Sequence, residues 1–305
     1  MFPVMKIGHG GDAELCHLKI ETAASRRSDV FTSNDRLQMP ESDEESNQFY
    51  RRSMELLEAA ELPFLVGGAY AFCVYTGIAR QTKDFDLFVR QRDFDRALEV
   101  FRLAGYEAEK TYPHWLGKVF RQDESIDVIY RAGNGLCPVD DSWFERAQTA
   151  EVFGKKARLT APEEMIWMKA FIMERERFDG ADVAHLLLHR GAQLDWDHLL
   201  RRFGPDWRVL LSHLTLFGYI YPAEKARVPN SILEQLLGRM KAGERESDSI
   251  CNGTLLSRAQ YLTDVREGGW RDARVDPRVG MSAAEAEAWS ELAEEQVKPH
   301  RAFRN

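Results

Sequence analysis

Three aspartates stand in apolar runs that are typical of β-strands. Asp84 and Asp86 belong to DFDLFV, residues 84–89, and Asp127 belongs to IDVI, residues 126–129. Side chains two apart in a strand point to the same side, so Asp84 and Asp86 project together. Neighbouring carboxylates repel one another unless a cation neutralises them, and hard oxygen ligands suit Mg²⁺, which is readily shared with substrate phosphates. The three acids therefore predict a metal-dependent phosphate site.

A pair of glycines precedes these acids. Gly67 and Gly68 follow the apolar run FLV at residues 64–66. Because glycine has no Cβ, the pair lets backbone amides come close to phosphate oxygens at the N-terminus of the next helix. A diglycine turn, an Asp-x-Asp strand and a later strand aspartate are the parts of a phosphoryl-transfer site. In a two-metal version, one metal holds a triphosphate and the other lowers the pKa of an attacking hydroxyl.

Short elements must position the glycines and the first two acids. Residues 46–60 have a helical pattern, and Phe64–Val66 forms a short buried strand. The small apolar residues Ala69–Tyr75 predict a helix packed tightly on a sheet, which Gly77 ends. The second strand is Asp84–Val89.

A further helix and a hairpin position the third acid. Asp93 is the expected N-cap of a helix that stops at Gly105. Residues 115–131 read as a β-hairpin whose turn is Gln122–Ser125, which places Asp127 in the second strand of the hairpin.

The pattern becomes helical after residue 135. Thr160-Ala-Pro-Glu163 predicts a capping box for a helix that runs to residue 178. Four further helices are expected, over Asp182–Arg190, Asp195–Phe203, Asp206–Phe217 and Ser231–Met240. Residues 241–305 contain a helical stretch, AAEAEAWSELAEEQ, and otherwise alternate charges with single hydrophobic residues.

At these residues the chain resembles the nucleotidyltransferase superfamily, the polymerase-β-like minimal nucleotidyltransferases. The signature is an apolar strand, Gly-Gly or Gly-Ser, a helix, Asp-x-Asp/Glu in the next strand and a third acid on a later strand. The matching residues are VGG at 66–68, DFDLFV at 84–89 and IDVI at 126–129. The resemblance covers about residues 60–130. It implies an α/β (α+β) fold, with a small mixed sheet flanked by helices and a mostly helical C-terminal domain.

The likeness extends to the toxin-like and uncharacterised bacterial branches of the superfamily. Arg80 and Thr82 fit their Arg-x-Thr-x-Asp-x-Asp variant. Toxin-type members also carry a helical Lys, an Arg about two turns later and Asp-x-x-Asp, and the matching residues here are Lys169, Arg175, Asp179 and Asp182.

The resemblance implies roles for these additional residues. Lys169 would contact the nucleotide phosphates, and Arg80, Thr82 and Asp182 would belong to the same nucleotide site. Simpler alternatives stay open: Lys169 could extend past an apolar face, Arg80 could be a surface residue, and Asp182 could cap the next helix.

The resemblance also implies a reaction. Mg²⁺ or Mn²⁺ would be held by Asp84, Asp86 and Asp127, an NTP such as ATP would bind at Gly67 and Gly68, and a nucleotidyl group would pass to an acceptor hydroxyl with release of pyrophosphate. The acceptor would be a small molecule, a tRNA end or a protein hydroxyl. Two alternatives are a toxin-like enzyme that modifies a tRNA end and a non-catalytic nucleotide-binding or interaction module.

Four segments are expected. Residues 1–47 are polar and predicted to be disordered, 48–150 form the nucleotidyltransferase domain, 151–240 form a helical domain, and 241–305 form a C-terminal appendage.

Composition narrows the function classes. The chain has 305 residues, 44% of them hydrophobic, and a net charge of −8, which argues against extended duplex nucleic acid as a partner. No apolar run approaches the roughly 20 residues of a membrane helix. The four cysteines are scattered without a CxxC pair, so we expect a reduced, cytoplasmic protein with no zinc cluster.

Overall fold

The computed structural model describes residues 44–80, 82, 84–243 and 249–297. The prediction of disorder for residues 1–47 therefore lies mostly outside the described residues. Residues 44–47, which it also includes, form the first turn of helix α1 (Glu44–Ala59). Within the described part of the chain, no helix is both long and apolar enough to cross a membrane.

The described residues contain a mixed β-sheet of seven strands. Its strand order is β3-β4-β5-β2-β1-β7-β6. The β2–β5 and β1–β7 pairs are parallel, and the other neighbours are antiparallel. The strands are β1 (Leu65–Val66), β2 (Asp84–Phe88), β3 (Glu107–Tyr112), β4 (Leu116–Arg121), β5 (Glu124–Ile129), β6 (Gln148–Val152) and β7 (Lys155–Leu159). This confirms the predicted mixed sheet. The expectation of a helical pattern directly after residue 135 is wrong, because β6 and β7 add two strands to the sheet at residues 148–159.

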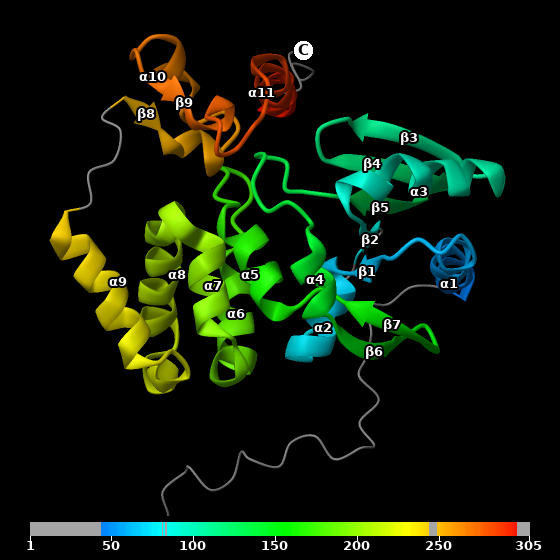
Figure 1. Cartoon of the computed structure of the whole chain (residues 1–305), viewed down its shortest axis with the longest axis horizontal. Helices are drawn as coiled ribbons and strands as arrows, with labels where there is room; N and C mark the ends of the chain where they lie inside the picture. Colours follow the sequence, from blue (N-terminus) through cyan, green and yellow to red (C-terminus); the bar gives the residue numbers. More distant parts are fainter. Residues whose placement is uncertain (1–43, 81, 83, 244–248, 298–305) are drawn as a thin grey trace, which may run out of the picture. The chain divides into compact units, whose positions relative to one another are not determined.

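Four helices accompany the sheet in the sequence and lie near it in Figure 1. They are α1, α2 (Gly68–Thr76), α3 (Gln91–Leu103) and the short α4 (Asp141–Glu145). Gly77 ends α2 in a left-handed conformation, as predicted. The predicted N-cap of α3 is wrong. Arg90 has an extended backbone and precedes the helix, whereas Asp93 lies inside the first turn, where its charge favours the helix dipole.

Five helices follow the sheet and lie together beside it in Figure 1: α5 (Pro162–Ala170), α6 (Gly180–Arg190), α7 (Trp196–Phe203), α8 (Trp207–Ile220) and α9 (Asn230–Ala242). This confirms the mostly helical C-terminal part. The group is joined to the sheet through contacts of α6 with α2.

Helix α5 differs from its prediction at both ends. Its N-cap is Ala161, because the Thr160 amide donates to the Val66 carbonyl and so extends the β7–β1 pairing rather than a capping box. The helix stops at Ala170 instead of residue 178. Residues 171–178 turn back on themselves, since the Glu174 amide donates to the Arg177 carbonyl and the Asp179 amide to the Ile172 carbonyl.

The last described segment combines short elements with one long helix. Strands β8 (Ile250–Cys251) and β9 (Arg271–Asp272) pair with each other, and α10 (Leu262–Arg266) lies between them in sequence. Helix α11 (Ala283–Val297) confirms the helical stretch expected there.

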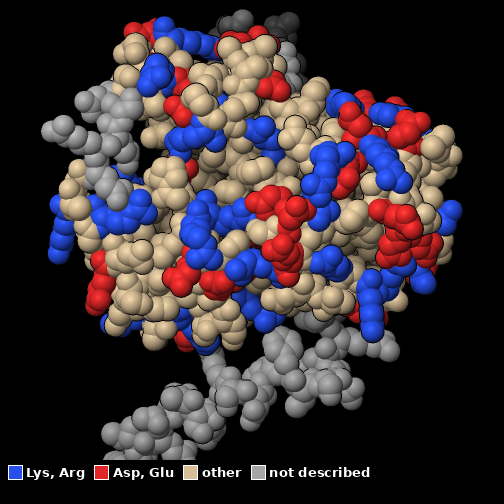
Figure 2. All heavy atoms as spheres, viewed as in Figure 1, with Lys and Arg blue, Asp and Glu red and all other residues tan. Residues whose placement is uncertain are grey.

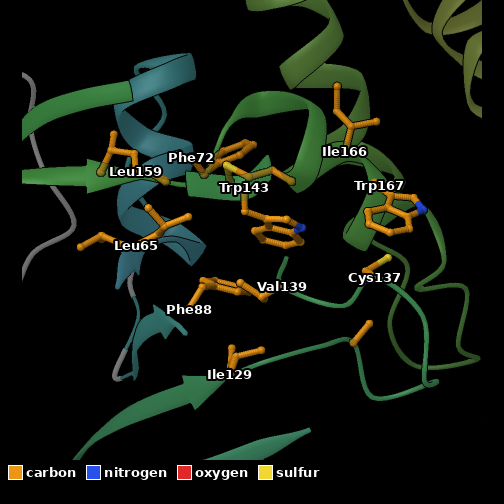
Figure 3. Packing of buried hydrophobic residues seen from close by; sticks show 14 of the residues in the cluster. Leu65, Phe72, Phe88, Ile129, Cys137, Val139, Trp143, Leu159, Ile166 and Trp167 are labelled. Atoms are coloured by element: carbon orange, nitrogen blue, oxygen red, sulfur yellow. The ribbon is translucent and has the colours of Figure 1, made fainter. Parts of the chain in front are cut away.

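Aromatic and aliphatic side chains join the sheet to the helices. In Figure 3, Trp143 of α4 lies between sheet residues such as Phe88 and the side chains of α5 such as Ile166. The Trp143 and Phe88 rings are stacked with centroids 5.5 Å apart, and both side chains are buried. Burying side chains of this size contributes about 2 kcal/mol each, so the strands that carry the acids rest on a packed layer.

Candidate active site

Strand pairing brings the predicted acids together. Asp86 of β2 lies opposite Asp127 of β5 in their parallel register, and Asp84 lies opposite Ser125. The Ser125 hydroxyl donates to the Asp84 carboxylate across 2.5 Å. The hairpin predicted from the sequence therefore places the third acid beside the Asp-x-Asp pair.

A lysine lies within this acidic cluster. Lys118 of β4 is opposite Asp127 in the antiparallel hairpin, and its Nζ is 2.5 Å from Asp127 Oδ1 and 3.6 Å from Asp84 Oδ1. Burial disfavours the Lys118 ammonium, but the hydrogen bond and charge of Asp127 outweigh this and raise its pKa. Its alternation with Val119 along β4 is the sequence signal that points to this residue.

The ionised forms of two of these carboxylates are disfavoured, which raises the pKa of each. Burial raises the pKa of Asp86 to about 7, and the charges of Asp127 and Asp84 add to the shift, while Lys169 and Lys118 oppose it. Burial also raises the pKa of Asp127, and Lys118 offsets only part of that effect. A bound cation would relieve this excess of negative charge.

The two glycines are required by close approaches. Gly68 has φ +54°, and a Cβ there would lie 1.6 Å from Asp86 Oδ2. A Cβ on Gly67 would lie 2.2 Å from the Phe88 ring, and the Gly67 amide donates to the Asp86 carbonyl across 3.0 Å. The N-terminus of α2 is thus held directly against the Asp86 carboxylate.

A second group of charges lies around Lys169. Its Nζ is 2.9 Å from Asp179 Oδ2 and 2.7 Å from Asp182 Oδ2. Arg80 forms an ion pair with the other carboxylate oxygen of Asp182. Burial would raise the pKa of Asp179, but the Arg177 and Lys169 partners outweigh it and lower the pKa.

The arginine of this motif is not the predicted one. Arg177 donates to both oxygens of Asp179, across 3.0 and 3.1 Å. Arg175 is exposed and pairs with its neighbour Glu176. The helical spacing on which Arg175 was predicted does not exist, because α5 has already ended. Thr82 contacts the backbone of Asp84, with its hydroxyl donating to the Asp84 carbonyl across 3.0 Å.

The acids and the lysine meet at one cavity of about 320 Å³. Gly68, Asp86, Asp127 and Lys169 line it, together with Arg177 and Asp179. The other predicted site residues are not among its lining residues: Gly67, Arg80, Thr82, Asp84 and Asp182. Of these, Gly67 contacts Asp86 and Asp182 contacts Lys169, both of which line the cavity. Sequence reasoning missed a further wall from the C-terminal segment, which includes Arg258 and Trp289. The irregular pattern of that segment holds no signal that could have indicated it.

The donor set at the carboxylate end suits a hard cation. In the described ranges, no three His, Cys, Asp or Glu side chains stand together as a metal site. The three aspartates offer oxygen ligands on adjacent strands, however, and the Lys118 ammonium already rests on two of them as a cation would. Mg²⁺ or Mn²⁺ therefore fits the chemistry of these residues.

The family of the chain follows from a sequence comparison. The model of a family described as uncharacterised nucleotidyltransferases matches residues 48–205, which include the glycines, all three acids and Lys169. The chain belongs to this nucleotidyltransferase family. No curated protein matches the chain.

Several solved structures are distantly similar. The lincomycin-bound lincosamide antibiotic adenylyltransferase LnuA is 14% identical, covers 47% of this chain and 95% of its own, and has a TM-score of 0.34. ANT(2")-Ia in complex with adenylyl-2"-tobramycin is 14% identical, with 58% and 99% coverage and a TM-score of 0.35. JHP933 from Helicobacter pylori is 16% identical, with 84% and 94% coverage and a TM-score of 0.35. At these scores the family assignment rests on the family model.

Proposed function

We propose that the protein transfers a nucleotidyl group from an NTP, such as ATP, to an acceptor hydroxyl and releases pyrophosphate. One observation carries this proposal. Asp86 and Asp127 lie in register at a cavity, with the backbone of Gly68 against Asp86 and Lys169 on the cavity wall. Family membership supports nucleotidyl transfer as the reaction class.

The reaction is a displacement at phosphorus. The acceptor oxygen forms a bond to the α-phosphorus, and the bond from that phosphorus to the oxygen that bridges to the β-phosphate breaks. The bonding electrons leave with pyrophosphate. The acceptor proton must pass to a base, and Asp127 suits this role because its carboxylate lies at the cavity, in register with Asp86.

Asp84, Asp86 and Asp127 would hold Mg²⁺ or Mn²⁺. When bound, the metal supplies positive charge that neutralises the triphosphate and lowers the pKa of the attacking hydroxyl. Lys118 would then keep Asp127 and Asp84 oriented in the absence of substrate, since its ammonium contacts both carboxylates.

The phosphates of the NTP would bind where the N-terminus of α2 approaches Asp86. Gly67 and Gly68 would present the N-terminus of α2 to phosphate oxygens. Lys169 and Arg177 line the same cavity and add positive charge. Asp182 would hold Lys169 in place, Arg80 would hold Asp182, and Thr82 would fix the first residue of β2.

The test is transfer of label. Each α-³²P-labelled NTP is incubated with the protein, Mg²⁺ and a cell extract, and both labelled product and pyrophosphate are measured. The account predicts labelled product and equal pyrophosphate for at least one NTP, with both lost in Asp86→Asn and kept in Asp123→Asn. Asp123 is the control because it is exposed, in the β4–β5 turn. Pyrophosphate release that persists in Asp86→Asn would exclude this site.

A further inference from the structure

The C-terminal segment forms one wall of the cavity, although it lies outside residues 48–205. Thr254 to Arg258 and Trp289 line the cavity together with Asp86 and Asp127. Asn134, in the loop after β5, donates to the Leu255 carbonyl across 2.7 Å. Gly133 in that loop allows a close approach of α11, since a Cβ there would lie 2.6 Å from the Trp289 ring. This wall is therefore fixed to the strand that carries Asp127.

The same wall is also attached to the turn after α5. The Met173 amide donates to the Leu256 carbonyl across 3.1 Å. Glu174 accepts from the Ser257 hydroxyl across 2.7 Å and from Arg258 Nε across 2.9 Å. Arg258 in turn lies over the Trp289 ring, 4.7 Å from its centroid. The C-terminal wall of the cavity is thus held to the turn after α5 by hydrogen bonds and an ion pair.

This side of the cavity is mostly apolar and aromatic. Trp289 packs edge-to-face on Trp115, with ring centroids 5.4 Å apart, and Ile129, Phe171 and Leu255 complete the lining. A triphosphate is disfavoured among these side chains, because the guanidinium of this wall, that of Arg258, is already paired with Glu174 across 2.9 Å. Aromatic walls of this kind bind flat or apolar groups.

Three polar atoms in the lining lack a hydrogen-bond partner within the described residues. They are the indole nitrogens of Trp115 and Trp143 and the hydroxyl of Thr160. The Trp143 and Thr160 side chains are both about 1% exposed. A buried donor left unpaired costs about 1–3 kcal/mol, so a ligand in this cavity that accepts hydrogen bonds from these residues would be favoured.

We propose that this aromatic side of the cavity is the acceptor subsite, and that it takes a small molecule with an apolar or aromatic ring system and oxygen acceptors beside the hydroxyl that is modified. The inference rests on the proposed function and adds the class of acceptor. The subsite is one side of the cavity of about 320 Å³, whose other side carries Gly68, Asp86 and Lys169. Trp289, Trp143 and Arg258 are then determinants of acceptor specificity.

The subsite adjoins the proposed base. Asp127 and Ile129 lie two positions apart on β5, so both side chains face the cavity, with Asp127 toward Asp86 and Ile129 toward the aromatic wall. An acceptor body held against Trp289 and Trp115 would therefore present its hydroxyl next to Asp127. The alternative occupant of this side is the nucleobase of the NTP. The two possibilities predict opposite effects of a substitution in the wall on nucleotide affinity.

The first test separates acceptor from nucleotide. In Trp289→Ala, we expect the dissociation constant for ATP and Mg²⁺ in titration calorimetry to stay within about two-fold, while transfer of label in cell extract falls about ten-fold or more. The matched control is Trp270→Ala, because Trp270 lies in the same segment and is 45% exposed outside this cavity. Trp289→Phe, which keeps an aromatic ring, should recover part of the transfer. A loss of ATP affinity equal to the loss of transfer would overturn the inference.

The second test identifies the class of acceptor. The extract is divided into a filtrate below 1 kDa, an RNA fraction and a protein fraction, and each is incubated with the NTP that gives labelled product. We expect label in the filtrate. Label confined to RNA or protein would leave nucleotidyl transfer established and overturn the small-molecule acceptor. No label and no pyrophosphate in any fraction would contradict the proposed function, and the inference with it.

Discussion

Two charge clusters face the same cavity, and they are built in opposite ways. The carboxylate cluster holds three acids, Asp84, Asp86 and Asp127, and one ammonium, that of Lys118, which contacts Asp84 and Asp127. In the paired cluster, Asp179 and Asp182 are matched by three cations, Lys169, Arg177 and Arg80. The pKa of Asp86 is raised to about 7, mainly by burial, whereas the ion pairs of Asp179 outweigh its burial and lower its pKa.

The difference separates carboxylates that are left for a cation from carboxylates that the protein's own cations already hold. The carboxylate cluster has an excess of negative charge, which destabilises the empty protein and favours a cation with its phosphates. In the paired cluster both carboxylates have cationic partners and one positive charge is in excess, so the cluster links α5 to α6 without a ligand and still leaves positive charge at the cavity. Elsewhere on the molecule, acidic and basic side chains are intermixed, as the face in Figure 2 shows.

The largest expected effect is on catalysis by the carboxylate cluster. Asp127→Asn should lower the turnover number by about 10²–10⁴-fold and change NTP affinity little, because the variant removes the proposed base and keeps the shape of the side chain. Steady-state kinetics and titration calorimetry check this, with Asp123→Asn as the control. A variant that loses NTP binding and unfolds would show that Asp127 is structural, and the contrast between the clusters would fail.

A substitution in the paired cluster should lower the free energy of unfolding. Lys169→Met leaves Asp179 and Asp182, whose side chains are 11% and 8% exposed, with less positive charge. We expect a loss of about 2 kcal/mol in the free energy of unfolding, softened by the remaining arginines. In the control, Lys110→Met, the broken pair with Asp95 is exposed, so the loss should be below about 1 kcal/mol. Equal losses measured by urea unfolding would show that the paired cluster does not support the fold.

Substitutions at Gly68 and Gly77 separate the effect of a steric clash from the effect of backbone strain. Gly68 and Gly77 both have positive φ, but a Cβ at Gly68 would overlap Asp86, whereas a Cβ at Gly77 meets no atom within 4 Å. Gly77→Ala should cost about 1 kcal/mol and leave activity unchanged. Gly68→Ala should cost more and abolish transfer, because the Asp86 carboxylate must move. Full activity in Gly68→Ala would show that the approach of α2 to Asp86 is not needed.

Local patterns predicted the carboxylate cluster well. The Asp-x-Asp run, the diglycine turn and the hairpin that carries Asp127 depend on alternation and turn residues. The structure has them as strand β2, the start of α2, and strands β4 and β5. The same kind of pattern indicates Lys118, because it alternates with Val119 on the strand opposite Asp127.

The other walls of the cavity depend on tertiary contacts that no local pattern encodes. Helix α5 was predicted to run to residue 178, since its residues are good helix formers. The backbone there instead bonds to Leu256, more than 80 residues further on. Arg177 therefore takes the position expected for Arg175, and Trp289 reaches the site through a loop glycine, Gly133.

The smallest expected effect is the pH dependence of the empty protein. Because the pKa of Asp86 is raised in the fold, the native state holds this proton more tightly than the unfolded chain, and ionisation destabilises it as the pH rises from about 4 to 7. In EDTA, Asp86→Asn should match the wild type near pH 4 and melt about 2–4 °C higher at pH 8. A variant that melts lower at pH 8 would show that the carboxylate is already neutralised by its partners.

The most direct test of the account measures thermal stability with and without ATP and Mg²⁺. The wild type should melt at a higher temperature when both are present, because ligand that binds only the native state stabilises it. The double variant Asp84→Asn, Asp86→Asn should keep or raise the melting temperature of the empty protein and show no further rise with ATP and Mg²⁺. An equal rise in the wild type and the double variant would contradict the assignment of the nucleotide and metal site to β2.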